Sequence, residues 1–327
     1  MPKENKSRTA EYKEDLARRY LTYQKNFFPK FEEYFERRNR PPPVFLMLKR
    51  HHNVLVRPGS TPEENARLIE LVPKNERHRQ FGSMNSSQAL AQSVLGNLAV
   101  HNELRCLNEI TDDDSGEPLF GNAELSSDNF VMERKVTYLG EREPHQTSLG
   151  GFISSEYQVA IECKFTESEI GSCSRPDLKP WKPTYETEFC NGTFTKQRGR
   201  TERCALTEIG VLYWKYIPEL FKWGTATDLS PCPLHGNYQL VRNVLAACVR
   251  SDGTVSAANS HAVLIYDERN PAFQNGGRGF VAFQDTREAL KDPSVLRKCS
   301  WQRIVKHLRS KMILPWLTDQ LALKYGL

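Results

Sequence analysis

Glu162 and Lys164 stand two residues apart in the stretch from Tyr157 to Phe165, where strand-forming apolar residues alternate with other types. Residues two apart in a β-strand point to the same face, so the spacing predicts that these two side chains project together. A carboxylate and an ammonium are costly to desolvate on a buried strand. We therefore expect them to bind a metal ion and a phosphate, or else to form a salt bridge on an edge strand.

A second group of residues with chemical potential lies in the segment 166–235. Within it, residues 166–204 have little periodicity and many Pro, Gly, Ser and Cys residues, so they are predicted to be an irregular insertion, whereas Ile209–Phe221 is aromatic and could be helical. Four thiolates can close a tetrahedral zinc site that orders such a loop. The spacing has no Cys-x₂-Cys pair, so buried free cysteines are the alternative, and His235 is an alternative fourth ligand. The four candidate zinc ligands are Cys173, Cys190, Cys204 and Cys232.

The composition bounds the class of protein. The chain has 327 residues, is 39% hydrophobic and 26% charged, and carries a formal net charge of +5. This length allows one large domain or two ordinary ones, and the mild basicity is compatible with a nucleic-acid partner. No stretch reaches the roughly 20 apolar residues of a membrane span, and no signal-peptide pattern follows Met1. We therefore expect a cytoplasmic protein without a membrane partner, in which the eight cysteines do not form a disulfide framework.

The periodicity predicts helices at both ends of the chain and strands in the middle. Aromatic residues recur at helical spacing within residues 1–40, and Cys106, Cys248 and Cys299 fall in patterns typical of buried helices. In chain order the predicted elements after residue 80 are a helix from Ser86 or Ser87 to about Val100, strands at Phe130–Tyr138, Thr147–Ser154 and Tyr157–Phe165, a helix at Asn237–Val249, a strand at His261–Tyr266 and two helices within 299–324.

The order helix, three strands, helix, strand, with Glu162-Cys163-Lys164 on the third strand, resembles the core of the PD-(D/E)XK nuclease superfamily. The chain is also similar to a bacterial group of restriction endonucleases within it. The segments that carry this resemblance are Ser86–Ala89, Tyr138–Glu141, Ile161–Glu167, Asn237–Arg242 and Asp267–Pro271. The resemblance implies an α/β fold with a mixed central sheet. It divides the chain into an N-terminal helical region (1–80), a nuclease core (81–310) with an insertion at about 166–235, and a C-terminal helix (311–327).

The resemblance also implies a metal-dependent endonuclease that acts on DNA, with RNA as an open alternative and a homodimer as a family expectation. Glu162 and the Cys163 carbonyl would hold Mg²⁺ or Mn²⁺, and Lys164 would orient the attacking water or stabilise the phosphorus. Gln88 would present its amide to the site. Gln239, together with Arg242, would orient the site or hold a phosphate.

One expected residue is missing. The superfamily carries an Asp on the second strand, and the corresponding position here is Gly150, in Thr147–Phe152. Three explanations stay open: an inactivating substitution that spares the host, a natural degenerate copy that binds without cutting, or a substitute acid. The candidate substitutes are Glu133, Glu141, Glu143 and Glu156. A β-bulge or a tight strand start would also explain the glycine.

Two functions of other classes therefore remain beside the nuclease. One is a catalytically dead nucleic-acid-binding or scaffold protein, and the other is a zinc-stabilised interaction module whose Glu–Lys pair is structural. Basic residues could line a DNA groove, although solvated helix faces explain such residues equally well. They are Arg198, Arg200, Arg203, Arg297, Lys298, Arg303, Lys306 and Arg309.

Overall fold

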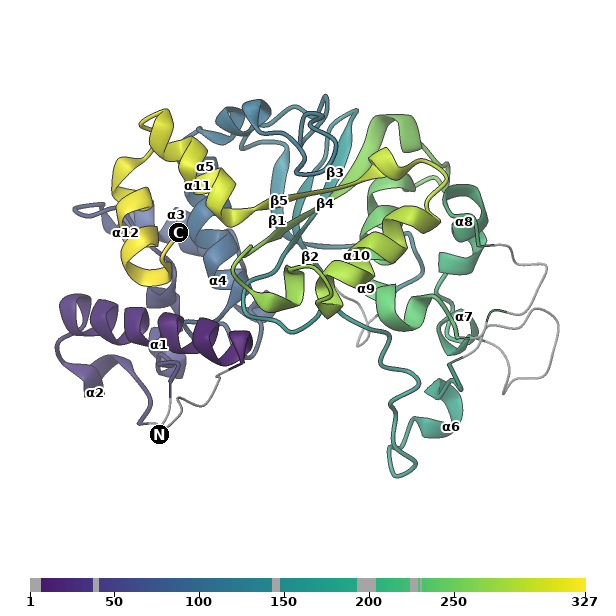
Figure 1. Cartoon of the computed structure of the whole chain (residues 1–327), viewed down its shortest axis with the longest axis horizontal. Coiled ribbons are helices and arrows are strands. Elements are labelled where there is room, and N and C mark those ends of the chain that lie inside the picture. Colours follow the sequence, from purple (N-terminus) through teal and green to yellow (C-terminus); the bar gives the residue numbers. More distant parts are fainter. Residues whose placement is uncertain (1–6, 38–40, 143–147, 193–203, 224–228, 230) are drawn as a thin grey trace.

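A five-stranded mixed sheet forms the centre of the protein in the computed structural model, which describes residues 7–37, 41–142, 148–192, 204–223, 229 and 231–327 (Figure 1). The strands follow one another across the sheet in chain order. The first three are antiparallel neighbours, and the last two run parallel to the third. The strands are β1 (Phe130–Lys135), β2 (Ser148–Ile153), β3 (Gln158–Cys163), β4 (Ser260–Tyr266) and β5 (Leu296–Ser300).

Helices cover both faces of this sheet, so the α/β prediction is confirmed. The helices are α1 (Arg8–Phe27), α2 (Phe31–Tyr34), α3 (Pro62–Glu70), α4 (Ser87–Ala91), α5 (Asn97–Val100), α6 (Tyr185–Glu188), α7 (Ala205–Glu208), α8 (Tyr213–Leu220), α9 (Leu234–Cys248), α10 (Arg278–Ala289), α11 (Trp301–Ser310) and α12 (Pro315–Tyr325). A π-helical turn, η3 (Gln92–Gly96), joins α4 to α5, which gives one helical run as predicted. The 3-10 turns are η1 (Met47–Asn53), η2 (Lys74–Glu76), η4 (Leu104–Glu109), η6 (Ala257–Asn259), η7 (Pro271–Phe273) and η8 (Pro293–Val295).

Strand β3 separates two hydrophobic clusters because its side chains alternate between the faces of the sheet. Val159 and Ile161 belong to the cluster under α1, α11 and α12, whereas Ala160 belongs to the cluster under α8, α9 and α10. Parallel strands need a long crossover connection, and α9 lies on the one that joins β3 to β4. The alternation predicted for this stretch is thus confirmed, and Glu162 follows Ala160 on the face that α9 covers.

The N-terminal helix packs on the rest of the protein rather than forming a separate unit. Ser7 caps α1, and the buried face of α1 carries Tyr12, Leu16 and Tyr20 into the same cluster as residues of β3 and α12. The Tyr12 hydroxyl donates to the carbonyl oxygen of Phe165 at 3.0 Å, directly after the Glu-x-Lys stretch. The region 1–80 therefore shares its core with the region 81–310. No helix in the described part of the chain is long and apolar enough to cross a bilayer.

Two elements differ from the sequence prediction. Cys299, predicted on a helix, lies on β5, where the adjacent polar residues Arg297 and Lys298 interrupt the alternation typical of a strand. Helix α10, which is absent from the predicted elements, begins directly after Gly277. Gly276 and Gly277 precede this helix. Glycines interrupt a periodic pattern, so they occur at the start of a helix as well as in a loop.

A buried histidine on β4 gives the fold a specific dependence on pH. The Nε2 atom of His261 lies 2.7 Å from the Leu119 carbonyl oxygen, which can only accept, so Nε2 carries the proton. Its Nδ1 atom lies 3.1 Å from the Tyr157 hydroxyl, which donates to it when the ring is neutral. Burial, with a smaller contribution from Arg297, lowers the pKa of His261 to about 3.

We predict that His261 destabilises the fold as the pH falls. The unfolded chain takes up a proton at a pKa of about 6.5, whereas the folded ring stays neutral until the pH nears 3. Between about pH 7.5 and about pH 5 this difference removes about 2 kcal/mol from the free energy of unfolding. Urea denaturation at both pH values should show this loss for the wild type and a loss about 2 kcal/mol smaller for His261→Gln. An equal loss in the two proteins would contradict the prediction.

Candidate active site

Glu162 and Lys164 pair on the central strand of the sheet. The Lys164 Nζ atom lies 2.9 Å from Glu162 Oε1, and the side chains are 9% and 12% exposed, respectively. The salt bridge that was the alternative interpretation is therefore present, but β3 is flanked by β2 and β4, so it lies on a central strand rather than an edge strand. Cys163, between them, is buried and pairs with Ile265 of β4. The pair is therefore held away from bulk water at the point where β3 ends.

Two amides of helix α9 complete the hydrogen bonds of this pair. The Gln239 Oε1 atom accepts from Lys164 Nζ at 2.7 Å, and Asn243 Nδ2 donates to Glu162 Oε2 at 2.9 Å. The two amides are four residues apart and so lie on one face of the helix. Sequence reasoning placed Gln239 at the site but missed Asn243, although the four-residue spacing was a usable signal.

The start of the insertion holds Gln239 in place. Gly171 has a φ of +138°, and a Cβ atom on it would lie 2.4 Å from the Gln239 Cδ atom. The backbone N–H of Gln239 also donates to the Gly171 carbonyl at 3.3 Å. Only glycine combines this conformation with so close an approach. The backbone at Gly171 therefore forms a wall against which the site amide rests.

Glu133 and Gly150 lie beside Glu162 across the antiparallel strands. Glu133 and Gly150 lie between the paired residues Met132–Gly151 and Arg134–Leu149 but are not themselves a register pair. The pair Gly151–Ile161 places Gly150 next to Glu162. Gly150 has no positive φ, and a Cβ on it would lie 3.3 Å from the Ile161 carbonyl oxygen, so a side chain needs only a small shift to fit. The irregular residue of this row is Glu133, whose φ is +52°.

The electrostatics of Glu133 reflect its partly buried position. Burial raises the pKa of Glu133; hydrogen bonds from Ser148 and Gln88 partly offset this, and the charge of Glu162 adds to the rise. The Ser148 hydroxyl donates to Glu133 Oε2. Gln88 of α4, which was predicted to present its amide to the site, thus lies beside Glu133 of β1. Its own position is fixed by bonds to the Glu76 carbonyl at 3.0 Å and the His78 N–H at 2.8 Å.

Lys164 stays cationic despite its burial. Desolvation lowers the pKa of Lys164, but the charges of Glu162 and Glu167 outweigh it, and the net change is upward. The Glu167 carboxylate is held by the Ser87 hydroxyl at 2.5 Å and by the Phe165 N–H at 2.6 Å. The end of the strand therefore presents an ammonium flanked by carboxylates.

Arg242 does not face an open site, so its predicted role as a phosphate ligand is not supported by the geometry. It is 1% exposed, and its Nε atom lies 3.2 Å from Glu141 Oε1. The Tyr213 hydroxyl donates to the same carboxylate. Arg242 reaches the site only through Asn243, whose Oδ1 atom lies 3.5 Å from Arg242 NH1. Glu141, one of the candidate substitute acids, is occupied by this ion pair.

The four candidate zinc ligands come together in space. Together with His235 they line one small cavity, and each of the four cysteines is buried. Burial raises the pKa of the Cys173 thiol to about 11 and that of Cys232 to about 12, with smaller contributions from the neighbouring thiols. As placed, no group of three or more His, Cys, Asp or Glu side chains among the described residues is arranged to hold a metal ion. The cysteines thus share a cavity without forming a closed ligand shell.

Several basic residues predicted for a DNA groove are paired instead. Lys298 lies 3.0 Å from Asp114, and Arg303 pairs with Asp113. Arg297 donates to the Pro118 carbonyl. The candidates Arg198, Arg200 and Arg203 lie outside the described residues, as does Glu143.

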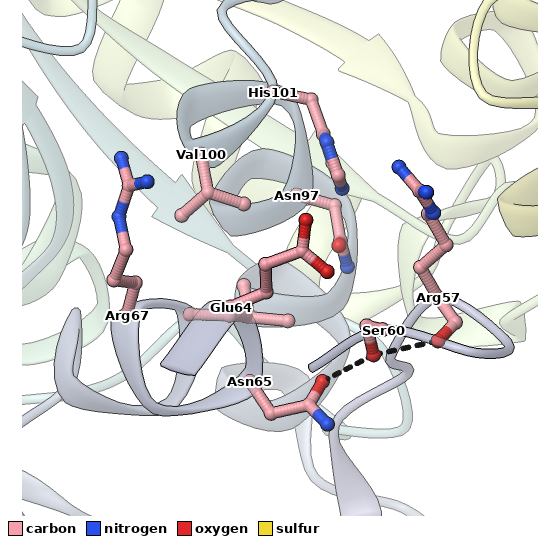
Figure 2. A pocket seen from close by; sticks show the side chains of 9 residues that line it. Arg57, Ser60, Glu64, Asn65, Arg67, Asn97, Val100 and His101 are labelled. Carbon is pink, nitrogen blue, oxygen red and sulfur yellow. Dashed lines mark hydrogen bonds between the residues drawn. The ribbon is translucent and has the colours of Figure 1, made fainter. Parts of the chain in front are cut away.

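A separate polar pocket, which the sequence did not predict, lies at the far end of the helical run from Gln88 (Figure 2). Figure 2 shows the Glu64 side chain between Arg67 and Arg57, with the Ser60 hydroxyl bonded to Asn65. The pocket is lined by Arg57, Ser60, Glu64, Asn65, Arg67, Leu68, Asn97, Val100 and His101. It contains none of the residues predicted to act in catalysis.

The fold and the central Glu–Lys pair define a restriction-endonuclease-like α/β protein. A model of the family described as Restriction Endonuclease associating with ARP (REase-ARP) matches residues 37–326. This span is most of the chain, so the protein belongs to that family. Searches of curated proteins and of solved structures found no match.

We predict that Gly171→Ala destabilises the protein and displaces the Gln239 amide. The new Cβ atom would lie 2.4 Å from the Gln239 Cδ atom, and the backbone of residue 171 has a positive φ that L-residues rarely adopt. The matched control is Gly276→Ala, where φ is +79° and nothing lies within 4 Å. Urea denaturation should give a loss about 1–3 kcal/mol larger for Gly171→Ala than for the control. Equal losses would show that contact with Gln239 is unimportant.

Proposed function

We propose that this protein is a metal-dependent endonuclease that hydrolyses phosphodiester bonds of DNA in restriction or genome defence. The single observation that carries the proposal is the buried Glu162–Lys164 pair on the central strand, held by two amides of α9. Membership of a restriction-endonuclease family supports the same reading. Assignment to the PD-(D/E)XK superfamily, the cytoplasmic location and a homodimer are part of the proposal, and RNA is a further substrate to test.

The residues present fit a hard divalent cation. Mg²⁺ takes oxygen ligands, keeps several waters, and is commonly bound by only one or two protein carboxylates together with substrate phosphates. Glu162 and the Cys163 carbonyl would hold Mg²⁺ or Mn²⁺ at the end of β3. The ion supplies positive charge that offsets the charge developing on the phosphoryl oxygens. Because one or two protein carboxylates suffice for Mg²⁺, such a site does not need a cluster of three or more ligating side chains, and the described residues contain none.

The protein's own side chains would then position the reactants. In hydrolysis the oxygen of a water molecule bonds to phosphorus, the bond from phosphorus to the leaving oxygen breaks, and that oxygen takes up a proton. Lys164, cationic and fixed by Gln239, would bind a phosphoryl oxygen or orient the water. Asn243 would keep the Glu162 carboxylate turned toward the site. Removing the ammonium should therefore lower the rate more than it lowers DNA binding.

One observation favours a second candidate function. Gly150 provides no carboxylate where the superfamily carries an Asp, which would suit a catalytically inactive nucleic-acid-binding or scaffold protein. The zinc-stabilised interaction module remains a third candidate because four buried cysteines share one cavity. In both cases the Glu162–Lys164 pair would be structural. Nuclease assays separate the enzyme from these two candidates, and zinc analysis tests the four-cysteine site that the third candidate requires.

We predict metal-dependent cleavage by the wild type or, if the Gly150 position is inactivating, by Gly150→Asp. Plasmid, single-stranded DNA and RNA are incubated with Mg²⁺ or Mn²⁺. Lys164→Ala should lower the rate by at least about 100-fold, because it removes a group that acts on the reacting phosphate. Lys311→Ala is the control, since Lys311 pairs with Glu109 at the surface. If neither the wild type nor Gly150→Asp cuts any substrate, while circular dichroism shows a folded protein, the nuclease proposal is rejected.

We also predict about one equivalent of zinc per chain after purification without chelators, bound by the four cysteines once their thiols close on the ion. Elemental analysis measures this directly. Cys173→Ser should lower the zinc content, whereas Cys106→Ser should not, because Cys106 lies on η4, far from the cavity in sequence and not part of its lining. A content below about half an equivalent in the wild type would contradict a four-cysteine zinc site.

A further inference from the structure

We infer that Glu133 of β1 supplies a second carboxylate of the candidate site, in the place where Gly150 of β2 leaves none. This inference rests on the proposed nuclease function and deepens it by naming a further metal ligand. It makes the third explanation for Gly150, a substitute acid, the one that the geometry favours.

The strand register carries the first step. Glu133 and Gly150 lie between the register pairs Met132–Gly151 and Arg134–Leu149, and Gly150 precedes the residue that pairs with Ile161, next to Glu162. Glu133 has a φ of +52°, so its side chain does not follow the regular alternation, and the Ser148 hydroxyl of β2 donates to its carboxylate. Because the middle residue is glycine, no side chain stands between the two glutamates. A glutamate is one methylene longer than an aspartate, so Glu133 can extend over Gly150 toward Glu162.

The surroundings of Glu133 also support its role as a metal ligand. Its carboxylate accepts hydrogen bonds from the Ser148 hydroxyl and the Gln88 amide, which are neutral donors. Within the part of the chain that the structure describes, it forms no ion pair with Lys or Arg. A partly buried carboxylate that faces a second carboxylate without a cation of its own is electrostatically unfavourable. A divalent ion between Glu133 and Glu162 would relieve this repulsion.

The other candidate acids are excluded by their positions. Glu141 is 3% exposed and pairs with Arg242. Glu156 is exposed in the turn before β3, six residues from Glu162, which corresponds to roughly 20 Å along an extended strand. Among the candidate substitute acids whose positions are described, Glu133 is thus the one that lies near Glu162 and is not already paired with a basic residue.

The experiment measures Mn²⁺ binding to the full chain by calorimetry, with the metal alone and no nucleic acid. Glu133→Gln keeps the size of the side chain and removes its charge, and it should weaken Mn²⁺ binding at least about tenfold, as the loss of a ligand or its close partner does. Glu156→Gln is the matched control and should leave the dissociation constant unchanged. Adding Gly150→Asp to Glu133→Gln should restore part of the lost affinity. Circular dichroism verifies that each variant is folded.

The failures of the two proposals are distinguishable. If Glu162→Gln abolishes Mn²⁺ binding while Glu133→Gln leaves it unchanged, the metal site stands and the role of Glu133 is overturned. If neither the wild type nor Gly150→Asp binds Mn²⁺, the proposed metal-dependent function fails, and this inference fails with it. Weakened binding in Glu133→Gln, with partial recovery in the double variant, supports both.

Discussion

The burial of an ion pair on a central strand is the constraint on which the rest of this structure depends. Removing a carboxylate and an ammonium from water costs several kcal/mol per ion, and Coulomb attraction offsets that cost only where the remaining hydrogen-bonding atoms are satisfied. Helix α9 meets this requirement by placing Gln239 on Lys164 and Asn243 on Glu162. The crossover helix that the parallel pairing of β3 and β4 demands is therefore also the element that makes the charged pair tolerable.

The surrounding elements act on the site through α9 and β1. The insertion holds Gln239 through the backbone of Gly171, so its fold and the geometry of the site are physically connected. The Glu141–Arg242 pair is fully buried and touches the site through Asn243. Replacing either member alone would leave an uncompensated charge in the core. The pair therefore fixes the orientation of α9 about its own axis. Contacts from several elements thus fix the orientation of the side chains in the site.

Local patterns predicted much of this arrangement, and long-range pairing explains what they missed. The alternation around Glu162 and the helical run from Ser87 were readable from the spacing of their apolar residues, although both elements are buried on nearly all sides. Strand β5 was not, since the adjacent polar residues Arg297 and Lys298 interrupt any alternation. The proximity of Glu133 to Glu162 depends on the pairing of three strands, which no local periodicity encodes. The same holds for the pairing of Lys298 and Arg303 with aspartates more than a hundred residues away.

The contacts of helix α1 have a consequence for the order in which the protein is made. Tyr12 bonds to Phe165 and to Asp267, which lie 153 and 255 residues further along the chain, and α1 also packs on α12 near the carboxyl end. During synthesis the amino-terminal part emerges first, but it finds Asp267 and α12 only after most of the chain has left the ribosome. These contacts of α1 are therefore completed late, after β3 and its charged pair have already been made.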